Sequence, residues 1–217
     1  MASRHEKGLA AARRLMEKRT PAPDHALQVC RLSLELFDQL ADLHRLGRSE
    51  RRLLEAAALL HDIGQSIDFP LHHKHARDLI LRAKLPGFDP EERAVIACVA
   101  RYHRKGHPQP GHKVFRDLPS DAQRVAASLA ALIRIADGLD RSQSSCTTAV
   151  HVSRDRSGVR IRVEQQVPND VDIWAANRKR GLFEEVFELP VDIQPSRTAV
   201  SETAEPERTT RSKPHPR

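Results

Sequence analysis

Hydrophobic residues recur at the spacing of an α-helix through the first two thirds of the chain. Within residues 24–46, Leu27, Leu34 and the leucines from Leu36 to Leu43 follow this spacing. Such a stripe allows one side of a helix to pack against a core while the other side faces water. The pattern predicts helices over residues 1–19, 24–46, 49–63, 73–83, 90–104 and 120–141.

Local signals at the ends of these segments support the helix boundaries. Asp89, Pro90, Glu91 and Glu92 form a strong helix start. The aspartate can cap free N–H groups, proline suits the first helical position, and acidic residues favour the positive end of the helix dipole. Other expected helix starts are Asp24, Ser49 and Ser120, the last with Gln123 in a capping box, and the expected helix ends are Gly47 and Gly64.

The spacing of the hydrophobic residues changes in the last third of the chain. Residues 147–167 alternate apolar and polar side chains on both sides of Ser157-Gly158, which predicts a β-hairpin. Residues 171–187 return to a helical pattern, and residues 188–193 (ELPVDI) predict a further strand. We expect Trp174 to anchor this closing helix on the hairpin.

Together these elements predict a mainly α protein, a helical bundle with a small C-terminal α/β module made of the hairpin plus a helix. We expect the helical domain over residues 1–145 and the module, packed on it, over residues 146–192. Residues 193–217 lack apolar content and are expected to form a disordered tail.

Composition narrows the possible environment and partners. The chain has 217 residues, a formal net charge of +7 and three scattered cysteines, which are typical of buried thiols in a reducing cytosol. No signal peptide and no apolar run of roughly 18 residues are visible, so we expect a cytoplasmic protein that does not cross a membrane. The positive charge favours acidic partners, among which phosphorylated small molecules and polyphosphate are as compatible as nucleic acid.

The most informative polar residues stand at the end of an apolar helix, in the segment ALLHDIG, where His61 and Asp62 are adjacent. A buried histidine or aspartate needs a partner. Adjacent helical residues point about 100° apart, so both can reach one metal ion only near a helix end. With His25 and Asp137, they would offer imidazole nitrogen and carboxylate oxygen to a divalent Mn, Mg, Fe or Zn ion. The alternative is a structural polar cluster without metal.

The order His25, His61-Asp62, Asp137 resembles the H…HD…D signature of the HD-domain metal-dependent phosphohydrolases. The segments HHKHARDLI, LPGF, VARYHRK and LIRIADGLDRS are similar to the C-terminal HD-like region of the exopolyphosphatase/guanosine pentaphosphate phosphohydrolase (Ppx/GppA) family. The resemblance covers roughly residues 8–192 and implies an HD-domain helical bundle.

Full-length members of that family begin with an actin-like domain that carries their polyphosphate or pentaphosphate hydrolysis. We expect this chain to lack that domain, so their activity does not transfer directly. Some long members depart from His-Asp at this motif, whereas this chain holds all four signature residues. That favours a metal site of its own.

The resemblance also implies roles for residues around the signature. HD hydrolases with two metals add histidines from the following helices, and a one-metal site would use a histidine as proton donor. The expected catalytic residues are Asp62, His72, His75 and His103. The expected phosphate-binding residues are Lys74, Arg101, Arg104, Lys105 and Arg141. The simpler alternatives are a polar helix start for the histidines and a solvated face for the basic residues, while His107 and His112 are expected on the surface.

The predicted function is therefore that of a divalent-metal-dependent phosphohydrolase acting on a nucleotide or another small phosphorylated polyanion, with one or two metal ions. The main alternative is a non-catalytic module that binds polyphosphate or alarmone, or that forms a homodimer or partners a separate actin-like phosphatase subunit. Nucleic-acid binding is the least favoured of these functions, because the sequence shows no recognisable DNA-recognition helix and no set of aromatic residues on which bases could stack.

Overall fold

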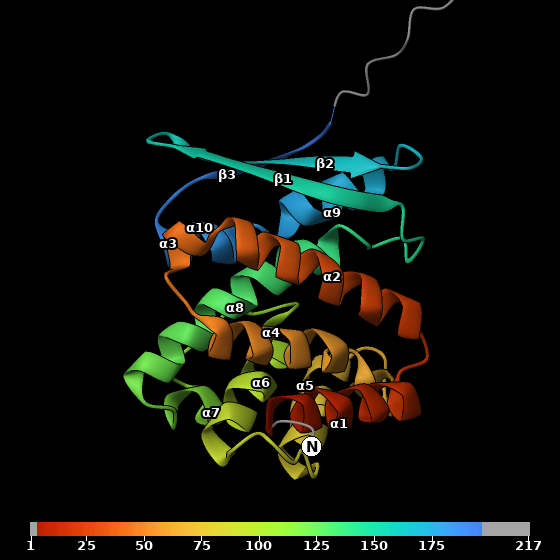
Figure 1. The fold of residues 1–217 in the computed structure, drawn as a ribbon, viewed down its shortest axis with the longest axis vertical. Coiled ribbons are helices and arrows are strands. Elements are labelled where there is room, and N and C mark those ends of the chain that lie inside the picture. Colours follow the sequence, from red (N-terminus) through yellow and green to blue (C-terminus); the bar gives the residue numbers. More distant parts are fainter. Residues whose placement is uncertain (1–3, 197–217) are drawn as a thin grey trace, which may run out of the picture.

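The computed structural model describes residues 4–196, in which helices form most of the molecule and a three-stranded sheet lies at one end (Figure 1). Residues 1–3, and most of the predicted tail, lie outside the described residues. The mainly α prediction with a small C-terminal α/β module is confirmed. The helices are α1 Arg4–Arg19, α2 Pro23–Gln39, α3 Ala41–His44, α4 Arg48–Leu60, the 3₁₀ helix η1 Ile63–Ser66, α5 His72–Arg82, α6 Pro90–Tyr102, α7 Lys113–Arg116, α8 Ser120–Gly138, α9 Asp170–Lys179 and α10 Gly181–Phe187.

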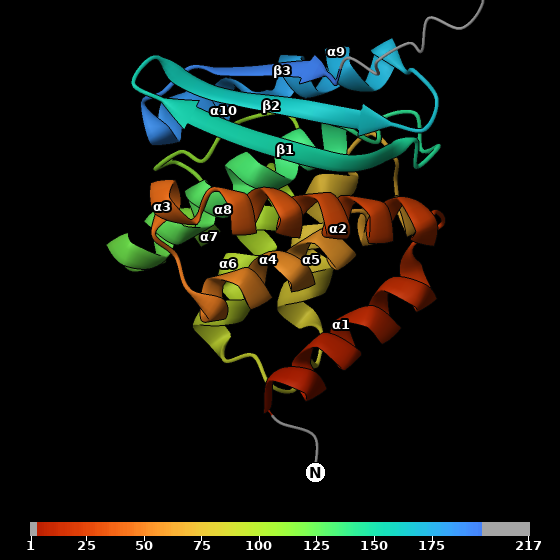
Figure 2. The same cartoon turned by 45° about the horizontal axis from the view of Figure 1, so that its top comes forward.

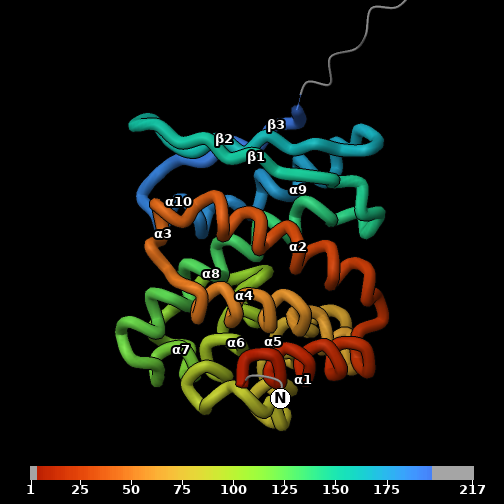
Figure 3. The backbone as a smooth tube through the Cα atoms, in the orientation of Figure 1, coloured from red at the N-terminus to blue at the C-terminus, as the bar shows by residue number. Residues whose placement is uncertain are grey.

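The sheet has the strand order β1-β2-β3, in which β1 and β2 are antiparallel and β2 and β3 are parallel. Strands β1 (Thr147–Asp155) and β2 (Gly158–Gln165) form the predicted hairpin, whose side chains alternate between buried and exposed positions. Strand β3 (Val191–Pro195) pairs parallel to β2, and such a pair needs a crossover connection. Helices α9 and α10 supply it, as the chain path in Figure 3 shows.

Helix α8 is the central helix of the bundle. It contacts α2, α4 and α6, and on another side α9 and α10. A methyl group at Gly138 would lie 2.5 Å from the Cα of Ala176, so the absence of a side chain allows α8 and α9 to pack closely. Helix α2 lies between the bundle and β1 (Figure 2). One continuous hydrophobic core therefore runs from α1 to the sheet.

Several helix ends differ from the expected ones. Helix α2 begins at Pro23, with Ala22 rather than Asp24 at the N-cap, and it ends at Gln39 instead of running to residue 46. Gly47 begins the next helix rather than ending the previous one, because the Glu50 carboxylate accepts a hydrogen bond from the Gly47 N–H at 2.7 Å. Ser49 is thus inside α4 and does not cap it.

Two further predictions of this kind are wrong. Ser120 is the first residue of α8, and Gln123 donates its amide hydrogen to the Leu118 carbonyl instead of closing a capping box. Gly64 does not terminate α4, which ends at Leu60, but lies within η1. By contrast, Asp89 caps α6 as expected, in a capping box with Glu92.

Trp174 does not anchor α9 on the hairpin. Its side chain is 60 % exposed, and the Arg178 guanidinium lies 5.1 Å from the centre of its ring. The reason is that Ala176, about 200° around α9 from Trp174, lies on the face that packs against the core. None of the helices within residues 4–196 is long and apolar enough to cross a membrane.

Candidate metal centre

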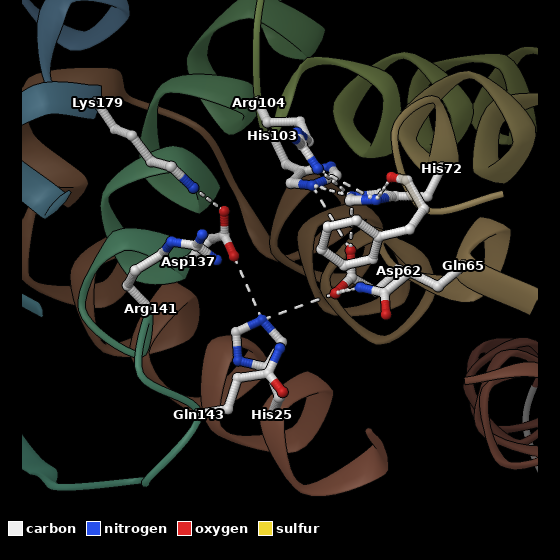
Figure 4. A pocket seen from close by; sticks show the side chains of 11 residues that line it. His25, Asp62, Gln65, His72, His103, Arg104, Asp137, Arg141, Gln143 and Lys179 are labelled. Atoms are coloured by element: carbon white, nitrogen blue, oxygen red, sulfur yellow. Dashed lines mark hydrogen bonds and ion pairs between the residues drawn. The ribbon is translucent and has the colours of Figure 1, made fainter. Parts of the chain in front are cut away.

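Four residues of the predicted signature converge at one buried point between α2, α4 and α8. Figure 4 shows three of them, His25, Asp62 and Asp137. His25 comes from the first turn of α2, His61 and Asp62 directly follow α4, and Asp137 lies in the last turn of α8. The Nε2 atom of His25 lies 3.3 Å from an oxygen of Asp137 and 3.8 Å from Oδ2 of Asp62. The Nε2 atom of His61 lies 3.6 Å from the same Asp62 oxygen.

The other carboxylate oxygen of Asp62 faces two more histidines. Its Oδ1 lies 3.1 Å from Nε2 of His72, at the start of α5, and 3.6 Å from Nε2 of His103, which follows α6. Asp62 is thereby shared by two groups of potential metal ligands. One group is His25, His61 and Asp62, and the other is Asp62, His72 and His103.

Backbone carbonyls fix the orientation of three of these rings. The Nδ1 atoms of His61, His72 and His103 each lie 2.7 Å from the carbonyl oxygen three residues earlier. A carbonyl only accepts, so each Nδ1 donates, and in the neutral ring the lone pair remains on Nε2. His61 and His103 are the C-cap residues of α4 and α6, where carbonyls lack partners within the helix.

The Nε2 atom of His61 supports a metal interpretation. It is buried and has no hydrogen-bond partner among the described residues. Buried polar atoms are nearly always paired, and an unpaired one calls for an ion, a water molecule or a ligand. Imidazole nitrogens together with a carboxylate suit first-row divalent metals. The residues of this centre therefore fit a metal ion.

His25 is oriented by a carboxylate that the sequence analysis missed. Its Nδ1 lies 2.8 Å from Oδ2 of Asp140, which is fully buried and also accepts a hydrogen bond from the Ser145 N–H. A carboxylate behind a ligating histidine makes the ring more basic and holds it in place. The signal was present in the segment IADGLD, where Asp140 follows Asp137 by three residues.

The charges of the centre are strongly coupled. Burial favours the neutral form of His25, but Asp137 and Asp140 outweigh burial and raise the pKa of His25 to about 10. Burial also opposes ionisation of Asp137, yet Lys179 and His25 hold its pKa well below the usual range. Lys179 forms an ion pair with Asp137 directly. Burial is likewise outweighed by the neighbouring His61 and His72, which lower the pKa of Asp62. Asp62 and Asp137 are therefore both ionised, as metal ligands must be.

The centre opens into a pocket, which we term the His/Asp pocket. Two of the five expected phosphate-binding residues, Arg104 and Arg141, line it, together with Lys179, for which the sequence offered no signal. The complete lining is His25, Asp62, Gln65, Phe69, His72, His103, Arg104, Asp137, Arg141, Gln143 and Lys179.

The remaining expected residues are placed outside this pocket. Lys74 is exposed, Lys105 donates a hydrogen bond to the Pro70 carbonyl at the surface, and Arg101 lines a separate pocket. His75 is half-buried, almost one turn further along α5 than His72. His112 is not a free surface residue, because its Nδ1 lies 2.9 Å from the Tyr102 hydroxyl.

Fold and site together define the class of protein. It is a helical domain of the HD-like kind, in which histidines and aspartates from separate helices meet at one buried point. A family model described as "Ppx/GppA phosphatase, domain III" matches residues 9–180. The chain belongs to this family, in agreement with the resemblance seen in the sequence.

Proposed function

We propose that this protein is a divalent-metal-dependent phosphohydrolase that acts on a nucleotide or another small phosphorylated polyanion. The main support is that Asp62 stands between two groups of ligating side chains, next to a pocket lined by Arg104, Arg141 and Lys179. Anionic ligand atoms beside cationic side chains suit a metal ion and a phosphate group together.

In this proposal His25, His61 and Asp62 hold one ion, and Asp62, His72 and His103 hold a second one where two are bound. Asp137 completes the first group from α8. A bound Mn, Mg, Fe or Zn ion supplies Lewis-acid activation of the phosphoryl group. The protein supplies preoriented Nε2 lone pairs on His61 and His103, which backbone carbonyls keep in place, while Asp140 holds the ring of His25, which would release its Nε2 proton on binding the ion.

The side chains at the edge of the pocket bind and orient the phosphate. Arg104 and Arg141 offer guanidinium groups whose shape matches phosphoryl oxygens. Positive charge there stabilises the negative charge that develops in the transition state. If only the first ion were bound, His72, which lines the pocket, would protonate the leaving oxygen through Nε2 from its imidazolium form, and the neutral ring left behind would keep its Nδ1–H on the Phe69 carbonyl.

Phe69 favours a nucleotide over an inorganic phosphate chain. Its side chain is 57 % exposed at the pocket, and the Arg104 guanidinium lies 6.0 Å from the centre of the ring. An exposed aromatic ring offers a stacking surface for a nucleobase, worth about 1–3 kcal/mol per base. An inorganic chain has no group that would use this surface.

The alternative is a non-catalytic module that binds a polyanion, forms a homodimer or partners an actin-like phosphatase subunit. One observation favours it: Lys179 already balances part of the Asp137 charge from within the protein. On this alternative the cluster is a structural polar centre, and Arg104 and Arg141 alone bind phosphate.

The two proposals differ in metal content and in the effect of ligand substitution. We expect purified protein to contain stoichiometric metal by elemental analysis and to hydrolyse members of a nucleotide panel. Asp62→Asn and His61→Gln should each lower the metal content and reduce turnover by about 100-fold or more. The exposed His151, which pairs with Glu164 on the sheet, provides His151→Gln as a control without effect.

Metal-free protein whose polyanion binding survives both substitutions would instead support the non-catalytic module. Charge removal at Arg104 or Arg141 would then weaken polyanion binding, and neither the wild type nor the variants would show turnover.

A further inference from the structure

A second pocket of about 360 Å³ lies between α5, α6 and the segment that leads into α7. It shares no lining residue with the His/Asp pocket. Its polar lining includes Arg77, Asp78, Arg101, Tyr102, His112 and Lys113, and we term it the Arg101 pocket.

Arg101 cannot serve the His/Asp pocket because of its place on α6. It precedes His103 by two positions, and side chains at this spacing point about 200° apart around a helix. His103 faces the metal centre, so Arg101 faces away from it. Arg104, one residue beyond His103, lines the His/Asp pocket instead.

The guanidinium of Arg101 lacks a counter-charge. Its Nε and Nη1 atoms are buried and have no hydrogen-bond partner, and no carboxylate within residues 4–196 forms an ion pair with it. Its nearest aromatic neighbour is Tyr102, whose ring centre lies 5.6 Å from the guanidinium carbon. Arg101 as a whole is half-buried, but donors of a charged group that are withdrawn from water without a partner are costly, which makes an anion in this pocket favourable.

The rest of the lining adds to the positive charge. Arg77 is paired with Asp78 at 2.7 Å, so its charge is offset, whereas Lys113 is exposed at the pocket. The pocket thus has three cationic side chains against one carboxylate, a surplus that matches the charge of a phosphate near neutral pH. Burial lowers the pKa of His112, and the neighbouring Arg101 and Arg77 lower it further, so His112 is neutral.

We propose that the Arg101 pocket binds a phosphate group, with Arg101 as its principal cation and Lys113 as a second. The group is either free inorganic phosphate or the phosphate of a small monoester. The proposal does not depend on metal or on hydrolysis, since none of its residues belongs to the metal centre.

Calorimetric titration of the full chain tests phosphate binding in the Arg101 pocket, with EDTA present so that metal binding does not contribute. Inorganic phosphate and ribose 5-phosphate are the probes, and at least one of them should bind saturably. Arg101→Gln should weaken that binding by at least about tenfold, as expected for a lost charge-assisted hydrogen bond. Asp78→Asn should strengthen it, because the competing carboxylate is removed. The matched control is Arg82→Gln on the exposed part of α5, which should bind like the wild type.

Other outcomes overturn the proposal. Absence of saturable binding of both probes means that the pocket holds only water. Equal affinity of wild type and Arg101→Gln, or complete loss of binding in Arg104→Gln, assigns the phosphate to the His/Asp pocket. If Arg101→Gln does not fold, Lys113→Gln at the exposed rim replaces it, and unchanged affinity there contradicts the site. Failure of hydrolysis alone has no bearing on these results.

Discussion

Histidine orientation in this protein begins with local backbone chemistry. A histidine directly after the last residue of a helix can donate Nδ1–H to a carbonyl that the helix leaves free, and both His61 and His103 do so. Their Nε2 atoms then point away from their own helices and toward Asp62. Two independent helix ends therefore present the same nitrogen to one centre.

Asp140 is expected to act as a positioning residue for His25. Asp140→Asn keeps the size of the side chain but removes the charge behind the ring, so metal affinity should fall by about 10- to 100-fold. Titration with a metal-sensitive dye measures this affinity, and urea unfolding of the metal-free protein measures stability separately.

Asp172→Asn is the matched control, because Asp172 is a buried carboxylate that bonds Ser142 and forms no hydrogen bond or ion pair with His25, so its longer-range charge interaction with that ring predicts a much smaller change in metal affinity. Equal metal affinity in Asp140→Asn and the wild type would show that Asp140 only supports the fold.

At the scale of elements, the close approach of η1 and α5 brings His72 to Asp62. Gly64 makes this approach possible. A methyl group there would overlap the carbonyl oxygen of His72 and lie 2.6 Å from the Ala76 nitrogen. The glycine is thus required by packing between two elements and not by the conformation of a helix end.

Gly64→Ala should therefore push α5 away from η1. We expect a loss of unfolding free energy of about 3 kcal/mol, the cost of overpacking against rigid backbone. Lower metal affinity should accompany it, because His72 moves with α5. Gly106→Ala provides the control, since nothing lies within 4 Å of a methyl group at that position. Similar urea midpoints for the two variants would contradict this account of Gly64.

For the whole molecule, the important interface joins the helical bundle to the sheet. Gln39 of α2 donates to the Val150 carbonyl at 2.7 Å and accepts from the Val152 N–H at 2.8 Å. Arg31 of the same helix donates to the carbonyl of Thr148 at 2.9 Å. These bonds to the edge of β1, and the continuous core, tie the predicted domains 1–145 and 146–192 together.

We expect the described parts of the chain to unfold as one cooperative unit. Circular dichroism follows the helices, and fluorescence of the sole tryptophan, Trp174 in α9, follows the C-terminal module. The two urea transitions should coincide. Gln39→Ala should lower the free energy of unfolding by about 0.5–1.5 kcal/mol, the net value of an ordinary hydrogen bond, and so move both urea midpoints down together. A fluorescence transition at lower urea than the helical one would mean that the module unfolds independently.

The sequence by itself determined the local features of this protein. Apolar periodicity predicted most helices and the hairpin, because burial of one face imposes a period of 3.6 or 2 on the residues. The spaced His25, His61-Asp62 and Asp137 identified the centre, because their order resembles the signature of the HD-domain phosphohydrolases. Helix ends were less predictable. Gly64 looks the same in sequence whether it ends a helix or permits close packing.

Only the tertiary structure decided which distant side chains share a site. Arg101 and Arg104 are only three positions apart, yet they line different pockets, because Arg101 lies in the last turn of α6 whereas Arg104 follows the end of that helix, where the chain turns away. The packing of α8 against α2 brings Asp140 to His25, and the packing of α8 against α9 brings Lys179 to Asp137. Periodicity specifies which face of a helix is buried, but the partner of that face depends on segments far away along the chain.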